Sequence, residues 1–143
     1  MPDPRQMPLL VVDDVPMIRA VVRAVLEQVG VHDVHEAADG AAALAMLNER
    51  PYGLVISDLH MFPMTGFELL RHVREDRRLR ETLFVMMTTK EHAHAFTAAR
   101  RAGVNACITK PFMPAALRKT LEEVWPTNPG NSGDGTETTT ALL

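Results

Sequence analysis

The chain has 143 residues, a length that fits one folded domain and leaves little room for a second. Hydrophobic residues make up 46% of it and charged residues 23%, which excludes a chain that is disordered throughout. The formal net charge of −3 excludes a global positive field that would attract nucleic acid or anionic lipid.

The two ends of the chain differ in composition from its middle. Residues 1–7 contain two prolines and are predicted to form a flexible N-terminal arm. Residues 127–143 lack lysine, arginine and aromatic residues and are predicted to form a disordered tail. We find neither a signal peptide nor an apolar run of the roughly 20 residues that span a membrane. With a single cysteine, Cys107, the sequence predicts a cytoplasmic protein.

Between these ends, apolar segments that could form strands alternate with segments of helical periodicity. The predicted strands are residues 8–12, 31–36, 54–57, 83–87 and 106–109. The predicted helices are residues 17–29, 39–50, 65–77, 91–102 and 114–124. This (βα)5 order implies an α/β fold, a doubly wound parallel sheet with helices on both faces. Ligands of such sheets bind beyond the carboxyl ends of the strands.

Polar residues follow four of the predicted strands: Asp13 and Asp14, then Asp58, Thr88 and Lys110. Each alone has an ordinary interpretation as a helix cap, a turn residue or a solvated lysine. Together at one sheet edge, however, three carboxylates repel one another unless a cation lies among them, and such an oxygen set suits Mg²⁺. Lys110 and Thr88 could each hold a phosphoryl oxygen, which leaves Asp58 placed as a nucleophile.

These residues lie in motifs that occur in a recognisable order. The motifs are Val11-Val12-Asp13-Asp14, Leu54-Val55-Ile56-Ser57-Asp58 with Met61 and Gly66, Met87-Thr88, and Lys110-Pro111-Phe112. With them, residues 8–126 resemble a response-regulator receiver domain of the single-domain chemotaxis type. The resemblance implies a flavodoxin-like, five-stranded parallel sheet in the strand order 2-1-3-4-5.

The resemblance also implies roles for the residues at the strand ends. Asp58 would accept a phosphoryl group, and Mg²⁺ would be held by Asp13, Asp14, Asp58 and the backbone carbonyl of His60. The donor would be the phosphohistidine of a sensor histidine kinase or of a histidine phosphotransfer protein. The chain would then be no enzyme beyond its own phosphorylation and dephosphorylation.

The resemblance also implies a conformational switch at the ends of the neighbouring strands. Thr88 would move toward the phosphoryl group, Lys110 would pair with that group, and the peptide bond before Pro111 would be cis. His60 and Lys90, two residues beyond Asp58 and Thr88, would modulate the lifetime of the phosphoryl group. We hypothesise that Lys90 slows the attack of water on it.

Some positions depart from the pattern of the family. Cys107 stands at the switch position, where many receivers have an aromatic residue, and either fills the core or removes one part of the switch. Phe62 separates Met61 from Pro63 in the loop after Asp58. We therefore expect switching to depend on Thr88 and its loop.

Two groups of basic residues have no predicted function. His92 and His94 are expected to point apart, which argues against a metal site. The arginine-rich stretch, which contains Arg71, Arg74, Arg77, Arg78 and Arg80, is expected to be a solvated helix face.

The expected output is phosphorylation-dependent contact with a downstream protein, such as a motor switch or a kinase, in chemotaxis or a phosphorelay. No DNA-binding helix pair follows Trp125, so we expect neither DNA nor membrane binding. One alternative is a haloacid dehalogenase-like metal-dependent phosphatase, although Leu59 and His60 stand where that family has a second acid. The other is a receiver-like adaptor that acts without phosphorylation.

Overall fold

The architecture is a parallel sheet, seen in a computed structural model that describes residues 3–125. The strands are β1 (Leu9–Val12), β2 (Val34–Ala37), β3 (Leu54–Asp58), β4 (Leu83–Thr89) and β5 (Ala106–Lys110). Neighbouring strands pair in parallel in the order β2-β1-β3-β4-β5. The predicted fold class and strand order are confirmed. The predicted tail, residues 127–143, lies outside the described residues.

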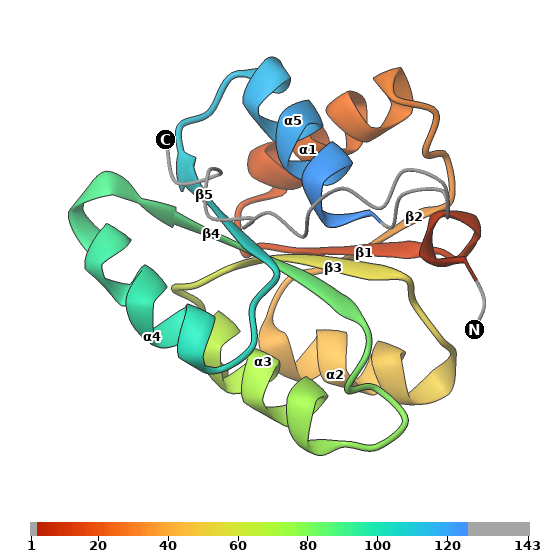
Figure 1. The fold of residues 1–143 in the computed structure, drawn as a ribbon, viewed down its shortest axis with the longest axis vertical. Helices are drawn as coiled ribbons and strands as arrows, with labels where there is room; N and C mark the ends of the chain where they lie inside the picture. The colour runs from red at the N-terminus through yellow and green to blue at the C-terminus, as the bar shows by residue number, and fades with distance from the viewer. Residues whose placement is uncertain (1–2, 126–143) are drawn as a thin grey trace.

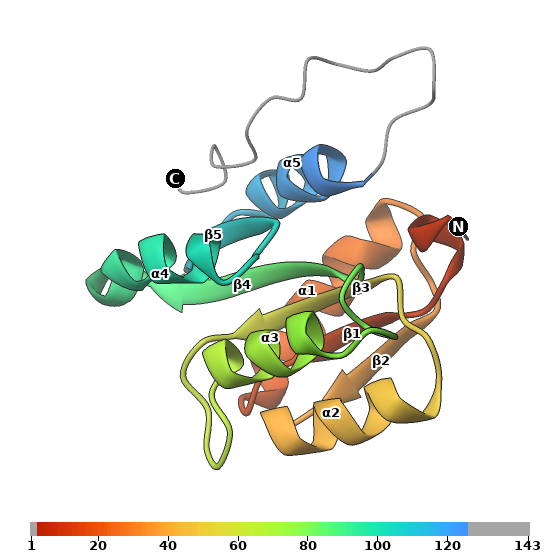
Figure 2. The same cartoon turned by 60° about the horizontal axis from the view of Figure 1, so that its bottom comes forward.

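Helices cover both faces of this sheet (Figure 1). They are α1 (Pro16–Gln28), α2 (Gly40–Glu49), α3 (Gly66–Glu75), α4 (Phe96–Arg101) and α5 (Pro114–Val124). Helices α1 and α5 lie on one face and α2, α3 and α4 on the other, a layering that Figure 2 shows from a second direction. Buried apolar residues form one core cluster under each set of helices. The strands β1, β3 and β4 are therefore buried on both faces, as their continuous apolar runs indicate, whereas the edge strand β2 carries His35 and Glu36.

Polar side chains cap the starts of α2 and α3, and a glycine follows the end of α1. Thr65 caps α3 in a capping box, in which its Oγ1 accepts from the Glu68 N–H and the Glu68 carboxylate accepts from the Thr65 N–H. Asp39 caps α2 by accepting from the Ala42 N–H at 2.8 Å. Helix α1 ends before Gly30, whose φ of +90° suits glycine. Within residues 3–125, no helix has the length and apolar character needed to cross a membrane.

The helix predicted over residues 91–102 is only partly correct. Residues Lys90–Ala95 form a 3-10 helix, η2, and the α-helix begins only at Phe96. Thr89 occupies the cap position of η2, but its side chain makes no capping hydrogen bond. Its Oγ1 lies instead 3.0 Å from His92 Nδ1. The first turn of η2 therefore has no side-chain cap of the kind that favours a regular α-helical start.

The arginine-rich stretch is also not uniformly solvated, because Arg74 is partly buried and tied to the backbone. Its guanidinium donates to the carbonyls of Arg80, Thr82 and Gly103 at 2.6–2.9 Å, and to Asn105 Oδ1 at 2.9 Å. The expectation of a solvated helix face is therefore wrong for Arg74, which joins α3 to the segments before β4 and β5. Arg77, Arg78 and Arg80 are exposed, but they lie beyond the end of α3 at Glu75.

The predicted N-terminal arm contains one turn of 3-10 helix, η1 (Pro4–Gln6), which Asp3 caps. The Pro4 carbonyl lies so close to Gly53 that a side chain there would collide with it. The flexibility of residues 1–7 stays a prediction.

Candidate functional site

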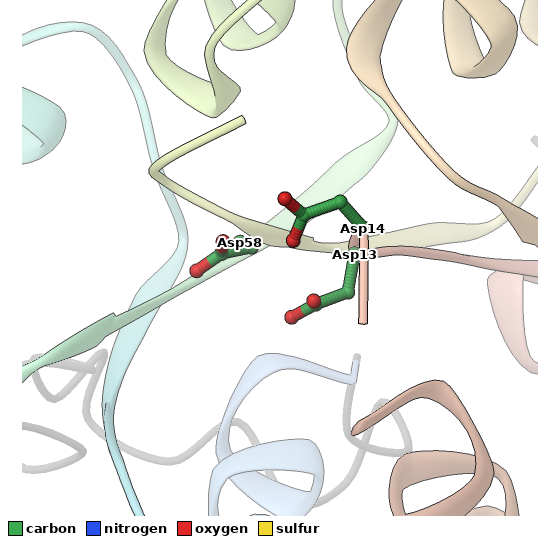
Figure 3. Close-up of side chains that lie close together, drawn as sticks. All are labelled: Asp13, Asp14 and Asp58. Atoms are coloured by element: carbon green, nitrogen blue, oxygen red, sulfur yellow. The ribbon is translucent and has the colours of Figure 1, made fainter. Parts of the chain in front are cut away.

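Three carboxylates meet at the carboxyl edge of the sheet. Asp13 and Asp14 directly follow β1, and Asp58 is the last residue of β3. Because β1 pairs with β3 with Val12 opposite Ser57, the next residues of the two strands lie side by side. Oxygens of all three aspartates lie within 4.8 Å of one another. Figure 3 shows the three side chains close together at the ends of β1 and β3, so the predicted cluster forms.

The three aspartates differ in their surroundings. Asp13 is 0% exposed and Asp58 is buried, whereas Asp14 is exposed. Burial raises the pKa of Asp13 and the charge of Asp58 adds to this, while the Val15 N–H, which donates to Asp13 Oδ1 at 2.8 Å, and Lys110 oppose it. Asp14 makes no hydrogen bond or ion pair with any residue of the described range. Its carboxylate is therefore available to a ligand.

Lys110, the last residue of β5, joins two of these carboxylates. Its Nζ lies 3.2 Å from Asp13 Oδ2 and 3.0 Å from Asp58 Oδ1. Burial acts to lower the pKa of the ammonium, but hydrogen bonds and charge from Asp58 and Asp13 outweigh it and raise that pKa. Lys110 is therefore charged at neutral pH. The following peptide bond, to Pro111, is cis as predicted.

Thr88 presents an unsatisfied hydroxyl near this group. The pairing of Asp58 with Met87 places Thr88 one residue further along β4. Its side chain is fully buried, and Oγ1 has no hydrogen-bond partner among the described residues. A buried hydroxyl without a partner costs roughly 1–3 kcal/mol, which a ligand oxygen could recover.

The chemistry of this donor set fits a hard divalent cation. Three carboxylates face a single ammonium, so two negative charges remain without compensation at this edge when all are ionised. Lys110 contacts one oxygen of Asp13 and one of Asp58, and the Val15 N–H donates to the other oxygen of Asp13. The second oxygen of Asp58 and both oxygens of Asp14 remain without such a contact within residues 3–125. An all-oxygen set of this kind is compatible with Mg²⁺.

The two predicted modulating residues have different surroundings. Lys90 is exposed and makes no hydrogen bond or ion pair within residues 3–125. His60 is exposed, and its ring centroid lies 4.2 Å from that of His92. The sequence did not indicate this contact, because His92 reaches His60 from a 3-10 turn where a regular helix was expected. His92 and His94 have ring centroids 6.2 Å apart.

Cys107 and Phe62, the two departures from the family pattern, lie in opposite environments. Cys107 is buried in β5, opposite Met86 of β4, and burial raises the pKa of its thiol to about 12. It is therefore a neutral core residue at physiological pH. Phe62 is 87% exposed in the loop after β3, and its peptide bond to Pro63 is cis.

Comparison with known proteins assigns this arrangement to a family. Residues 9–122 match the model of the response regulator receiver domain. The chain belongs to this receiver family. The chemotaxis protein CheY1 of Helicobacter pylori is 38% identical over 123 residues, which cover 85% of this chain and 99% of that protein. CheY-3 of Vibrio cholerae is 34% identical over 121 residues, covering 85% and 93%.

A solved receiver structure agrees with the sequence relatives. The chemotaxis response regulator CheY4 of Vibrio cholerae superposes on this receiver domain with a TM-score of 0.76 at 35% identity, covering 82% of this chain and 98% of that one. The predicted resemblance to chemotaxis receivers is confirmed. The alternatives, a dehalogenase-like phosphatase and a phosphorylation-independent adaptor, are not favoured by these relatives.

Proposed function

We propose that this receiver domain accepts a phosphoryl group on Asp58 from the phosphohistidine of a sensor histidine kinase or a histidine phosphotransfer protein. The observation that carries this proposal is the position of Asp58 in the cluster. Its carboxylate lies 3.0 Å from the Lys110 ammonium and within 4.8 Å of two further carboxylates, near the unpartnered hydroxyl of Thr88. This set supplies a nucleophile, a metal-binding group and two donors for phosphoryl oxygens.

Phosphoryl transfer from the donor histidine to Asp58 would take place in a single displacement, in which the protein supplies the nucleophile and binds the phosphoryl oxygens. A carboxylate oxygen of Asp58 attacks phosphorus, the P–N bond to the donor imidazole breaks, and the imidazole leaves with the bonding electron pair. Mg²⁺, held by Asp13, Asp14, Asp58 and the His60 carbonyl, would neutralise charge on the phosphoryl oxygens. Lys110 binds one phosphoryl oxygen and so exchanges its carboxylate partner for the new group. The Thr88 hydroxyl donates to another oxygen.

Signalling follows from the added charge. Movement of the Thr88 hydroxyl toward the phosphoryl group displaces the start of η2, which directly follows β4. Because the small Cys107 occupies the position of the family's switch aromatic, we propose that Thr88 and this segment carry the response. The reader of the altered surface would be a downstream protein, such as a motor switch or a kinase. Beyond its own phosphorylation and dephosphorylation the chain would catalyse nothing.

The metal requirement gives a direct test of the proposal. With acetyl phosphate and Mg²⁺ the protein is expected to acquire one acid-stable, base-labile phosphoryl group, because the cation offsets repulsion between donor and carboxylates. Removal of Mg²⁺ by a chelator should reduce the labelling by at least roughly a hundredfold, which intact-mass measurement over time would detect. Equal labelling with and without Mg²⁺ would contradict the proposal.

Lys90 gives a prediction about the lifetime of the phosphoryl group. Replacing Lys90 by alanine is expected to speed dephosphorylation by roughly two- to fivefold, since an exposed charge contributes up to about 1 kcal/mol. The decay of phosphorylated protein after removal of the donor measures this effect. Lys119→Ala, which removes an exposed lysine on α5, is the control. Identical decay of the wild type and Lys90→Ala would show that Lys90 does not affect the lifetime of the phosphoryl group.

A further inference from the structure

Arg19 of α1 connects the acidic cluster to the edge strand of the sheet. Its Nε donates to Glu36 Oε1 at 2.8 Å, and its Nη1 donates to the backbone carbonyl of Asp13 at 2.6 Å. The Arg19 side chain is only 17% exposed. One planar guanidinium therefore spans from β2 to the residue that begins the acidic pair.

The accepted carbonyl determines how the two aspartates are arranged. It belongs to the planar peptide unit that joins Asp13 to Asp14, so its direction fixes the relative placement of the two residues. The other side of Asp13 is also held, because its N–H donates to the Ala37 carbonyl at 3.1 Å. Successive residues of β2, Glu36 and Ala37, thus hold Asp13, one through Arg19 and one directly.

We propose that Arg19 is a positioning residue for the acidic pair and that it raises the affinity of the site for Mg²⁺. This inference rests on the proposed function, in which Asp13 and Asp14 hold the ion. Arg19 acts through the Asp13–Asp14 peptide unit and itself contacts no ligand. Without its hydrogen bond the peptide unit rotates more freely, and the carboxylates spend less time in the arrangement that binds the ion.

Charge alone predicts the opposite effect. The Arg19 guanidinium binds the Asp13 carbonyl, so its positive charge would disfavour a divalent cation at the neighbouring carboxylates. Its removal would strengthen Mg²⁺ binding if it acted only through its charge. The ion pair with Glu36 reduces this repulsion. The sign of the change in Mg²⁺ affinity therefore distinguishes positioning from electrostatics.

Arg23, one turn further along α1, provides a matched control. Its Nε donates to the other oxygen of Glu36 at 2.9 Å, and its Nη2 donates to the Val34 carbonyl at 2.8 Å. Arg23 thus has the same charge, the same carboxylate partner and one backbone acceptor, but that acceptor is remote from the aspartates. Replacing Arg23 therefore removes a guanidinium charge, an ion pair with Glu36 and a hydrogen bond to a backbone carbonyl, but leaves the contact between Arg19 and Asp13 intact.

The test compares Arg19→Ala and Arg23→Ala with the wild type by titration with Mg²⁺ alone. Arg19→Ala is expected to raise the Kd about threefold to tenfold, somewhat below the effect of losing a partner of a ligand side chain. Arg23→Ala is expected to stay within about twofold of the wild type. Amide hydrogen exchange without Mg²⁺ provides a second readout, since the Val15 N–H bonded to Asp13 Oδ1 should exchange faster only in Arg19→Ala.

The possible failures can be told apart. Unchanged or tighter Mg²⁺ binding by Arg19→Ala, or equal weakening in both variants, overturns the inference. A wild-type protein that binds no Mg²⁺ overturns the proposed function instead. If Arg19→Ala does not fold, Arg19→Lys retains the charge without the fork, and an unchanged Kd with unchanged Val15 exchange in that variant equally overturns the inference.

Discussion

Replacing Lys110 by alanine is expected to lower the free energy of unfolding at pH 7 by about 1–3 kcal/mol and to slow phosphoryl uptake by about a hundredfold. The Lys110 side chain is 15% exposed, and its ammonium is shared by Asp13 and Asp58. Its loss leaves two buried carboxylates facing each other without a nearby cation. The same change removes the donor proposed to hold a phosphoryl oxygen. Chemical denaturation and the labelling rate with acetyl phosphate measure the two effects.

The stability defect of Lys110→Ala should depend on pH. The pKa of Asp13 is already raised by burial, and loss of the Lys110 charge raises it further. A carboxyl group whose pKa is higher in the folded state makes folding less favourable as pH rises through its titration range. The difference in unfolding free energy between wild type and variant should therefore shrink as the pH falls from 7 into the titration range of Asp13.

Mg²⁺ should partly rescue the stability of Lys110→Ala. Since the ammonium no longer competes for the carboxylates, the ion should raise the Tm of the variant more than that of the wild type. Lys119→Ala controls for the loss of a lysine. A defect in Lys110→Ala that is independent of both pH and Mg²⁺ would contradict this description of the cluster.

Gly66→Ala is expected to destabilise the protein by about 2–4 kcal/mol and to weaken Mg²⁺ binding. A Cβ at Gly66 would collide with the backbone carbonyl of Asp58 and come within 3.1 Å of Leu59 Cα. The Gly66 N–H also donates to the Leu59 carbonyl at 2.9 Å, so the start of α3 lies directly against the end of β3. Relief of the collision separates the start of α3 from the end of β3, and we expect Asp58 to shift with that end. Denaturant unfolding and Mg²⁺ titration measure both consequences.

Gly30→Ala separates this collision from a general cost of replacing glycine. Gly30 has a φ of +90°, but a Cβ there meets no atom within 4 Å. We expect this variant to lose about 1–2 kcal/mol of stability and to retain the Mg²⁺ affinity of the wild type. Because alanine favours helices by about 1 kcal/mol over glycine, a stabilised Gly66→Ala would show that no collision exists.

The sequence predicts that the site residues lie together, because each of them follows or ends a strand of the parallel sheet. The apolar runs before Asp13, Asp58, Thr88 and Lys110 mark parallel strands, and such strands bring the residues after them to one edge. The cap of α3 at Thr65 can also be predicted from the sequence, because a threonine three residues before a glutamate is a local signal of a helix start. The strand order came from the resemblance to receiver domains, and the pairing of the strands confirms it.

The features that were missed depend on contacts between distant residues. The 3-10 helix Lys90–Ala95 follows Thr89, whose hydroxyl contacts His92 and makes no capping hydrogen bond. Helical periodicity gives no signal of either feature. Arg74 and Arg19 each reach backbone carbonyls, acceptors that every residue carries and that give no sequence signal. A long basic side chain on an amphipathic helix therefore has the same pattern whether it is solvated or buried.

Intact-mass analysis of wild type and Asp58→Asn after incubation with acetyl phosphate and Mg²⁺ decides whether Asp58 is the phosphoryl acceptor. Asparagine preserves the size of the side chain but removes the nucleophilic carboxylate. We expect one phosphoryl group on the wild type and none on Asp58→Asn. Equal labelling of the two proteins would contradict this expectation.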